Sequence, residues 1–330
     1  MALDGSSLFE DRAAYSIAKL KQLNSSLANA PAVDAFPEIA IFCAGSYARH
    51  EASEHSDIDP FFITTQDRNY FNEEYRVPKI RMMSEIISIG DRLNFPKFSN
   101  DGQFLRVLHL PDILAHLGGD EDDYRNYFTS RLLLILESRP LYGEEIYKRV
   151  LDEVLESYFR DYPSHTDDFH VRFLLNDIVR FWKTLCLNYE NRRNNRASTE
   201  SEKVKRKVRN FKLKFSRLLT CYASIAYLSS LETPVTKTDV VAMTQLTPMQ
   251  RLDAVAKRVP DIEPFVQRAT DEYRWFLAQT GQSAPDLHQC FADKGFRADA
   301  FNRAERFGDE IFKVLSEIDK TSSVFRHLVI

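Results

Sequence analysis

Glycine is scarce in this chain, and its scarcity constrains the fold more than any other feature. Only 10 of the 330 residues are glycine, whereas tight turns need glycine and helix interiors exclude it. The sequence therefore predicts a mostly helical protein. Two short apolar runs, at residues 38–43 and 58–64, have the length and composition of β-strands instead. We expect them to be neighbouring strands of one sheet, with residues 104–109 as a weaker third strand.

The remaining segments have helical periodicity. Apolar residues recur every three or four positions in residues 8–30, 79–95, 122–137, 144–158 and 168–189. A further long helix is expected to bury one apolar face, made of Val204, Val208, Phe211, Phe215, Leu218, Leu219 and Tyr222. We therefore predict an α+β fold: a small mixed-sheet domain at residues 1–140, followed by a larger all-helical domain at residues 141–330 that forms the other wall of a cleft.

Composition excludes several classes of protein. A net charge of −4, with 28% charged and 44% hydrophobic residues, is that of an ordinary globular chain. The longest apolar runs fall far short of the ~20 residues that a spanning helix needs, so we expect no membrane partner. The chain start has no cationic segment followed by an apolar one, which predicts a cytoplasmic protein. The four cysteines form no CxxC pair, which favours reduced thiols over disulfides or a zinc site.

The residues that carry chemistry lie between the two strongest strands. Gly45 and Ser46 follow the first run, where backbone N–H groups and a hydroxyl can approach an anion closely, so they predict a phosphate-binding turn. Asp57 and Asp59 are two residues apart at the start of the second run, and on a strand this spacing projects both carboxylates from one face. Two carboxylates beside a phosphate site can hold Mg²⁺ or Mn²⁺. This segment is thus the candidate nucleotide-binding and metal-binding site.

At these residues the sequence resembles the DNA polymerase β-like nucleotidyltransferase superfamily, whose signature is a Gly-Ser pair followed by Asp-x-Asp on the next strand. The added Arg49, Glu51 and Ser56 are most similar to the nucleotidyltransferase domains of bacterial PII-protein uridylyltransferases and their relatives. The resemblance covers residues 38–140. It implies a magnesium-dependent transferase that moves a nucleoside monophosphate from ATP or another NTP to a hydroxyl and releases pyrophosphate.

The same resemblance assigns roles to further residues. Arg49 would steer phosphate and Glu51 would orient Arg49 or a metal-bound water, although the two side chains could equally form a surface ion pair. Active members place a third catalytic carboxylate on a later strand, and Asp101, which precedes the third run, is a better candidate for it than Asp112. Pro60 departs from the family pattern and predicts a free strand edge or a bulge just after Asp59.

A basic segment stands out in the helical half. The segment that begins with Arg192 and ends with Arg217 contains eleven Lys and Arg against two Glu. It is either an anion-binding wall, which makes nucleic acid an alternative partner, or a solvated helix face preceded by an exposed loop. In the superfamily a basic residue of the helical domain often binds the NTP phosphates, and Lys212 or Lys214 would have that role here.

Three functions remain open at this stage. The leading hypothesis is nucleotidyl transfer to a protein or small-molecule acceptor. The second is template-independent synthesis of a nucleic acid or a cyclic nucleotide, which the basic segment favours. The third is an inactive nucleotide-binding regulatory module that lacks the third carboxylate. No histidine is followed by aspartate, so the phosphohydrolase half that accompanies the uridylyltransferases is not expected, and the enzyme would add a nucleotide without removing it.

Overall fold

The computed structural model describes residues 7–36, 38–67, 76–98, 105–194, 199–320 and 322–329. They form two compact units, Phe9–Ser157 and a second unit made of Met1–Leu8 and Tyr158–Ile330. The described chain is mostly helical with one small mixed sheet, in agreement with the predicted α+β class. The first unit extends past residue 140, where the sequence placed the domain boundary, because the segment up to Ser157 packs on the sheet.

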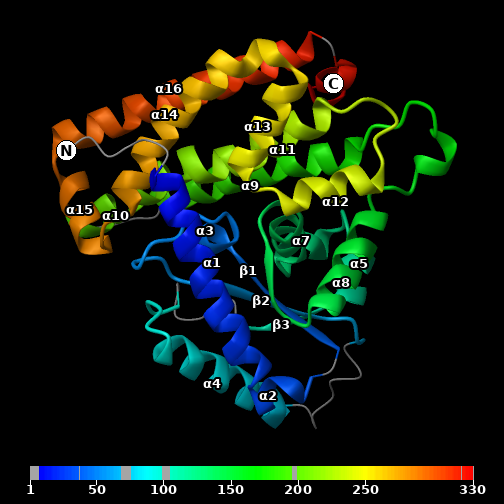
Figure 1. Ribbon diagram of the computed structural model, residues 1–330, viewed down its shortest axis with the longest axis vertical. Coiled ribbons are helices and arrows are strands. Elements are labelled where there is room, and N and C mark those ends of the chain that lie inside the picture. The colour runs from blue at the N-terminus through cyan, green and yellow to red at the C-terminus, as the bar shows by residue number, and fades with distance from the viewer. Residues whose placement is uncertain are drawn as a thin grey trace. The chain divides into compact units, whose positions relative to one another are not determined.

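The first unit contains the whole sheet of the described chain (Figure 1). Its strands are β1 (Ile39–Ala44), β2 (Asp59–Thr64), β3 (Val107–His109) and β4 (Arg139–Tyr142), in the order β3-β2-β1-β4. β1 pairs antiparallel with β2 and β4, and β2 pairs parallel with β3. The helices of this unit are α1 (Ser7–Ala28), α2 (Pro31–Asp34), α3 (Gly45–Ala48), α4 (Arg76–Arg92), α5 (Leu110–Ala115), α6 (Asp120–Tyr124), α7 (Tyr127–Leu136) and α8 (Glu144–Glu156).

Strand alternation divides the sheet into two packed faces. Ile41 and Phe62, which are partners in the β1–β2 register, belong to a core that also holds apolar residues of α1 and α4. On the opposite face Phe42 stacks on Phe61, with ring centroids 5.4 Å apart, and contacts Tyr147 of α8. Helices therefore cover both faces (Figure 1), which explains why the strands read as nearly continuous apolar runs.

Strand β4 was not predicted, because its segment lies between the helices expected at residues 122–137 and 144–158. Its four residues lie at the edge of the sheet, where Pro140 is tolerated because an edge strand leaves N–H positions unpaired. Gly143 ends the strand with a φ of +67°, and a Cβ there would lie 2.3 Å from the Ile39 carbonyl oxygen. A four-residue strand that contains a proline is too short to show the alternation of apolar and polar residues by which a strand is recognised in a sequence.

Pro60 occupies a strand edge without a bulge. The β1–β2 register runs without interruption through Pro60, which pairs with Cys43, whereas β3 pairs with β2 only from Phe62 onward in the described chain. Of the two alternatives predicted from the sequence, the free edge is therefore correct. The third strand itself begins at Val107, later than the predicted residue 104.

The second unit is built from helices. They are α9 (Arg172–Asn194), α10 (Glu200–Lys212), α11 (Leu218–Ser229), α12 (Lys237–Gln245), α13 (Pro248–Arg258), α14 (Glu263–Thr280), α15 (Ala284–Ala292), α16 (Lys294–Asp319) and α17 (Arg326–Val329), with short 3₁₀ turns at Tyr162–Ser164, Pro260–Ile262 and Ser323–Phe325. A π-helical turn, η4 (Leu213–Arg217), joins α10 to α11. Helices α14 and α16 lie side by side (Figure 1).

An aromatic cluster forms the centre of this unit. Phe215 stacks on Phe276 and Phe307, with ring centroids 4.8 and 4.9 Å apart. Phe211, one turn earlier, contacts Phe276 and Phe291. Both Phe211 and Phe215 are fully buried, as the apolar periodicity of this segment predicted.

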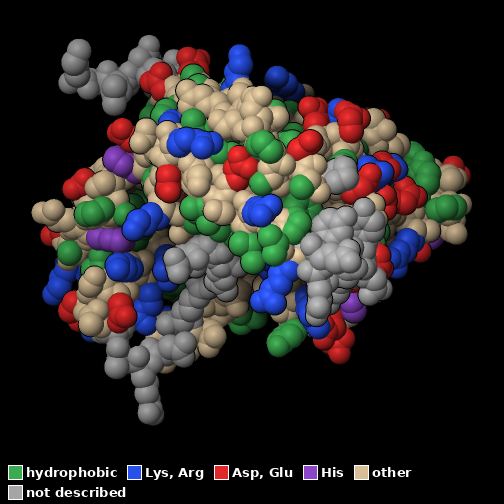
Figure 2. Space-filling view, turned by 90° about the horizontal axis from the view of Figure 1, so that it is seen from below, with side chains coloured by type: hydrophobic (Ala, Val, Ile, Leu, Met, Phe, Trp, Pro, Cys, Tyr) green, Lys and Arg blue, Asp and Glu red, His purple; other side chains and the backbone are tan. Residues whose placement is uncertain are grey.

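The surface carries both signs of charge. In the view of Figure 2, Lys and Arg side chains are interspersed with Asp and Glu. Among the described residues, no helix combines the length and the apolar character needed to cross a membrane.

Candidate functional site

The Gly45–Ser46 turn and the Asp59 carboxylate are brought together by strand pairing. β1 ends at Ala44, whose register partner is Asp59, the first residue of β2. Gly45 then adopts a φ of +77°, a conformation that L side chains rarely adopt, and a Cβ at this position would lie 3.2 Å from Asp59 Oδ2. The turn is therefore tight, and it places the carboxylate directly against the glycine. Ser46 follows in α3 and is half-buried.

Asp57 lies just outside the strand. The predicted strand begins at residue 58, whereas β2 begins at Asp59, so the strand pairing fixes Asp59 but not Asp57. Ile58, between them, is buried in the core formed with α1 and α4. The Asp57 carboxylate is half-buried, and its charge is one of the lesser causes, after burial, that raise the pKa of the Tyr47 phenol. Among the described residues it makes no hydrogen bond or ion pair.

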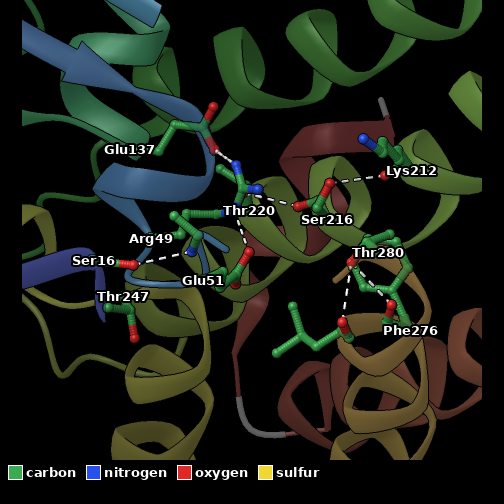
Figure 3. A network of polar contacts seen from close by, with 12 residues as sticks. Ser16, Arg49, Glu51, Glu137, Lys212, Ser216, Thr220, Thr247, Phe276 and Thr280 are labelled. Carbon is green, nitrogen blue, oxygen red and sulfur yellow. Dashed lines mark hydrogen bonds and ion pairs between the residues drawn. The ribbon is translucent and has the colours of Figure 1, made fainter. Parts of the chain in front are cut away.

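Arg49 and Glu51 form a buried cluster with Glu137 (Figure 3). Arg49 Nε donates to Glu51 and its Nη1 donates to Glu137, each at 2.7 Å, and all three side chains are nearly inaccessible to solvent. Glu137 is the C-cap residue that directly follows α7. The alternative that Arg49 and Glu51 form a surface ion pair is wrong in that the pair is buried. The cluster ties the segment after α3 to the end of α7, so it holds the site's backbone in place.

A second contact fixes the same segment. The Ala52 N–H donates to Ser16 Oγ of α1 at 3.0 Å, and Ser16 is fully buried. Further along, the Ser53 N–H donates to Ser56 Oγ at 3.0 Å. Ser56, which belongs to the family pattern, therefore closes a short turn that leads into Asp57.

Two basic residues near the turn were missed in the sequence. Arg139 of β4 pairs with Cys43, so it lies beside the end of β1. His50 follows α3 with a φ of +59°, and burial, together with the positive charge of Arg139, lowers its pKa to about 4. Burial raises the pKa of the Cys43 thiol to about 12, where Arg139 acts against the rise and Asp59 adds to it. Arg139 and Asp59 therefore both lie close to the end of β1.

The third carboxylate of the family pattern is not placed. Asp101 lies outside the described residues. Asp112 accepts a hydrogen bond from the Tyr127 hydroxyl at 3.2 Å. Within the described part of the chain, no three Asp, Glu, His or Cys side chains are grouped to hold a metal ion. Mg²⁺ usually takes only one or two carboxylates and completes its shell with waters and substrate phosphates, so Asp57 and Asp59 could hold it without a third acid.

Lys212 and Lys214 belong to the second unit and have different neighbours. Lys212 ends α10, is exposed and lies near His288 of α15. Lys214 lies in η4 near Cys186 of α9. The two candidate lysines therefore lie in different surroundings. Arg196, near the start of the basic segment, lies outside the described residues.

Comparison with known proteins adds no name to this site. No family model matches the chain, and no curated protein matches it significantly in sequence. The assignment of a function therefore depends on the geometry of the residues themselves.

Proposed function

We propose that the chain is a magnesium-dependent nucleotidyltransferase of the DNA polymerase β-like type, which moves a nucleoside monophosphate from an NTP to a hydroxyl of a protein or small-molecule acceptor. The observation that carries this proposal is the contact between the Gly45 turn and the Asp59 carboxylate. A turn without a side chain gives a polyphosphate close access to backbone N–H groups, while the adjacent carboxylate provides a hard oxygen ligand for a cation.

Each residue of the site has a defined role in this proposal. Asp57 and Asp59 would hold the ion, which neutralises negative charge on the triphosphate when bound. The Ser46 hydroxyl, half-buried beside the turn, would donate to a phosphate oxygen. Arg139, close to Asp59 at the end of β1, would add positive charge next to the phosphates.

The cluster of Arg49, Glu51 and Glu137 has a positioning role. Its three charges are buried and paired at 2.7 Å, so the Arg49 guanidinium is held by two carboxylates beside α3. We therefore expect it to fix the backbone that follows Ser46. This role replaces direct steering of phosphate by Arg49, because two acids already accept from its Nε and Nη1.

The decisive experiment measures pyrophosphate release from each labelled NTP with Mg²⁺ or Mn²⁺. The double variant D57A/D59A should lose turnover by about a thousandfold or more, because both ligands of the ion are gone. The matched control is D11A/D91A, which removes two exposed aspartates of the same unit and should keep wild-type turnover. Unchanged pyrophosphate release in D57A/D59A would refute the site.

The fate of the label identifies the acceptor. Label on the protein or on a small molecule supports the proposed acceptor class, whereas an extended RNA or a cyclic product supports template-independent synthesis. Nucleotide binding without pyrophosphate release would contradict transfer and leave the regulatory nucleotide-binding module as the remaining function.

A further inference from the structure

One face of α10 carries a row of basic side chains. Lys205, Arg209 and Lys212 follow the spacing i, i+4, i+7, which places them on the same side of a helix. At 1.5 Å per residue the row is about 10 Å long. All three side chains are exposed, while Val208 and Phe211 of the adjoining face are buried.

The neighbouring helix α15 contributes His288 to this row. Helices α10 and α15 pack against each other. Burial lowers the pKa of His288, and the positive charges of Lys205, Lys212 and Arg209 lower it further. All three cations of the row therefore converge on one imidazole. We name these four residues the α10–α15 basic row.

The acidic residues nearest to this row in sequence are engaged at the starts of their own helices. The positions three and four residues away from Arg209 and Lys212 hold no Asp or Glu. Glu202, three residues before Lys205, accepts from the Thr199 N–H in the capping box of α10. Asp286 of α15 accepts from the Ser283 hydroxyl at the start of its own helix. Within the described chain, Lys205 and Arg209 form no ion pair.

The excess of positive charge in the second unit comes from this region. Residues 158–330 contain 28 Lys and Arg against 22 Asp and Glu, and residues 199–217 alone contain eight against two. The difference of six is the same for both ranges, so the other residues of 158–330 are balanced. Such local concentration is typical of a surface that attracts a polyanion.

We infer that the α10–α15 basic row binds the phosphate backbone of single-stranded nucleic acid, independently of nucleotidyl transfer. The row is straight and repeats its charges along one line, which matches successive phosphates of a flexible strand. Helix α10 packs against α15, so only the exposed face that carries the row is open to a strand. Because the contacts are to phosphates, binding does not depend on the bases.

Salt dependence of binding tests this inference quantitatively. The probes are fluorescein-labelled U₂₀ and A₂₀ RNA, titrated with the full chain at 50 to 200 mM salt without NTP or metal. Three phosphate contacts on a single strand contribute a log–log slope of about −2, which is about a twentyfold loss of affinity over this range. We expect the variant K205Q/R209Q/K212Q to lack this part of the slope and to bind both probes at least about tenfold more weakly at 50 mM salt.

The control variant is K257Q/K294Q/K320Q. It removes the same charge from three exposed lysines of the same unit, one in α13 and one at each end of the 26-residue helix α16, and it should keep the wild-type slope. Equal losses in both variants, no salt-dependent binding by the wild-type chain, or a strong preference for one of the probes would each overturn the inference.

A single charge reversal distinguishes loss of charge from misfolding as the cause of weaker binding. Glutamine and glutamate both support a helix, so R209E should keep the wild-type circular dichroism and melting temperature while it weakens binding more than R209Q does. Equal binding by R209E, R209Q and the wild-type chain would refute the row. Because the assay contains no nucleotide, a negative result here leaves the proposed transferase activity untouched, and loss of that activity leaves this result untouched.

Discussion

The two units stabilise their interiors in different ways. In Phe9–Ser157, charged side chains are buried in pairs: Arg131 and Asp122 form a double hydrogen bond at 2.9 and 2.8 Å, and both are fully inaccessible. In the second unit the centre is an aromatic cluster around Phe215. The first unit is made partly of helices with four to six residues, such as α3 and α6, which bury little apolar area. Directional charge pairs fix such short elements, whereas the long helices of the second unit pack mainly through apolar contact. The buried Arg251 of that unit donates to the Met243 carbonyl and the Ser224 hydroxyl.

The two units also differ in net charge. Residues 9–157 contain 16 Lys and Arg against 25 Asp and Glu, whereas residues 158–330 have a basic excess. Negative charge thus accumulates in the unit that contains the candidate cation ligands, and positive charge in the unit that carries the α10–α15 basic row. The comparison teaches that the formal net charge of this chain, −4, is the sum of an acidic first unit and a basic second unit.

The largest expected effect is on the buried ion pair. Arg131→Met should lower the free energy of unfolding by about 3–5 kcal/mol, because it leaves the Asp122 carboxylate buried without its counter-charge. Urea unfolding of the full chain followed by circular dichroism measures the loss. Arg125→Met is the control, since Arg125 forms an exposed pair with Glu121, and it should not shift the unfolding midpoint. Equal effects of the two substitutions would contradict the importance of buried charge in this unit.

The next effect concerns the turn at the candidate site. Gly45→Ala should cost about 1–2 kcal/mol, because alanine is strained at a φ of +77°. The added Cβ would also displace Asp59 Oδ2. The rate of pyrophosphate release should therefore fall by more than the loss of folded protein accounts for. Gly308→Ala, at a helical position with no atom near the added Cβ, should stabilise the chain slightly. A Gly45→Ala variant with wild-type stability and turnover would show that the tight turn is unimportant.

A smaller effect is expected in the aromatic cluster. Phe215→Leu keeps an apolar side chain but removes two stacked contacts, and should cost about 1 kcal/mol. The same substitution at Phe312, which is 69% exposed, should change nothing measurable. Thermal unfolding monitored by near-ultraviolet circular dichroism would separate the two. If Phe215→Leu cost as much as Arg131→Met, the contrast between the two interiors would disappear.

The smallest effect at neutral pH is that of His50, whose contribution to stability changes only as the pH falls. The pKa of His50 is about 4 in the folded chain, below its ordinary value of 6.5, so the unfolded chain takes up a proton there first. Stability is therefore lost as pH falls from 6.5 toward 4. His50→Asn, which tolerates the left-handed backbone, should flatten the melting temperature between pH 7 and 4. An identical slope in both proteins would exclude His50 as a contributor.

Local patterns predicted much of this structure. The apolar runs at 38–43 and 58–64 became β1 and β2 with shifts of one residue at most, because strands buried on both faces show as continuous apolar sequence. The apolar face through Phe211 and Phe215 was predicted because helical periodicity repeats over many turns. In the candidate site, Gly45, Ser46 and Asp59 meet through the pairing of these two strands.

What the sequence did not reveal depends on distant segments. Arg139 lies beside Cys43 only because β4 pairs with β1, although β4 begins 95 positions after Ala44 in the sequence. Glu137 joins Arg49 across a similar distance, and nothing in its own segment marks it as a partner. Asp57 fell outside the strand because pairing with β1 ends at Asp59. Such proximity follows from tertiary packing and leaves no local period to detect.

The π-helical turn at Leu213–Arg217 has a consequence for the rod formed by α10 and α11. One surplus residue in a helical turn rotates everything beyond it by about 100°. Helix α10 has a solvent-exposed, charged face, whereas nearly every residue of α11 is buried. The π-helical turn thus changes which side of the helix faces the core. It allows α10, with one exposed face, to continue into the buried α11 without an interruption of the helical backbone.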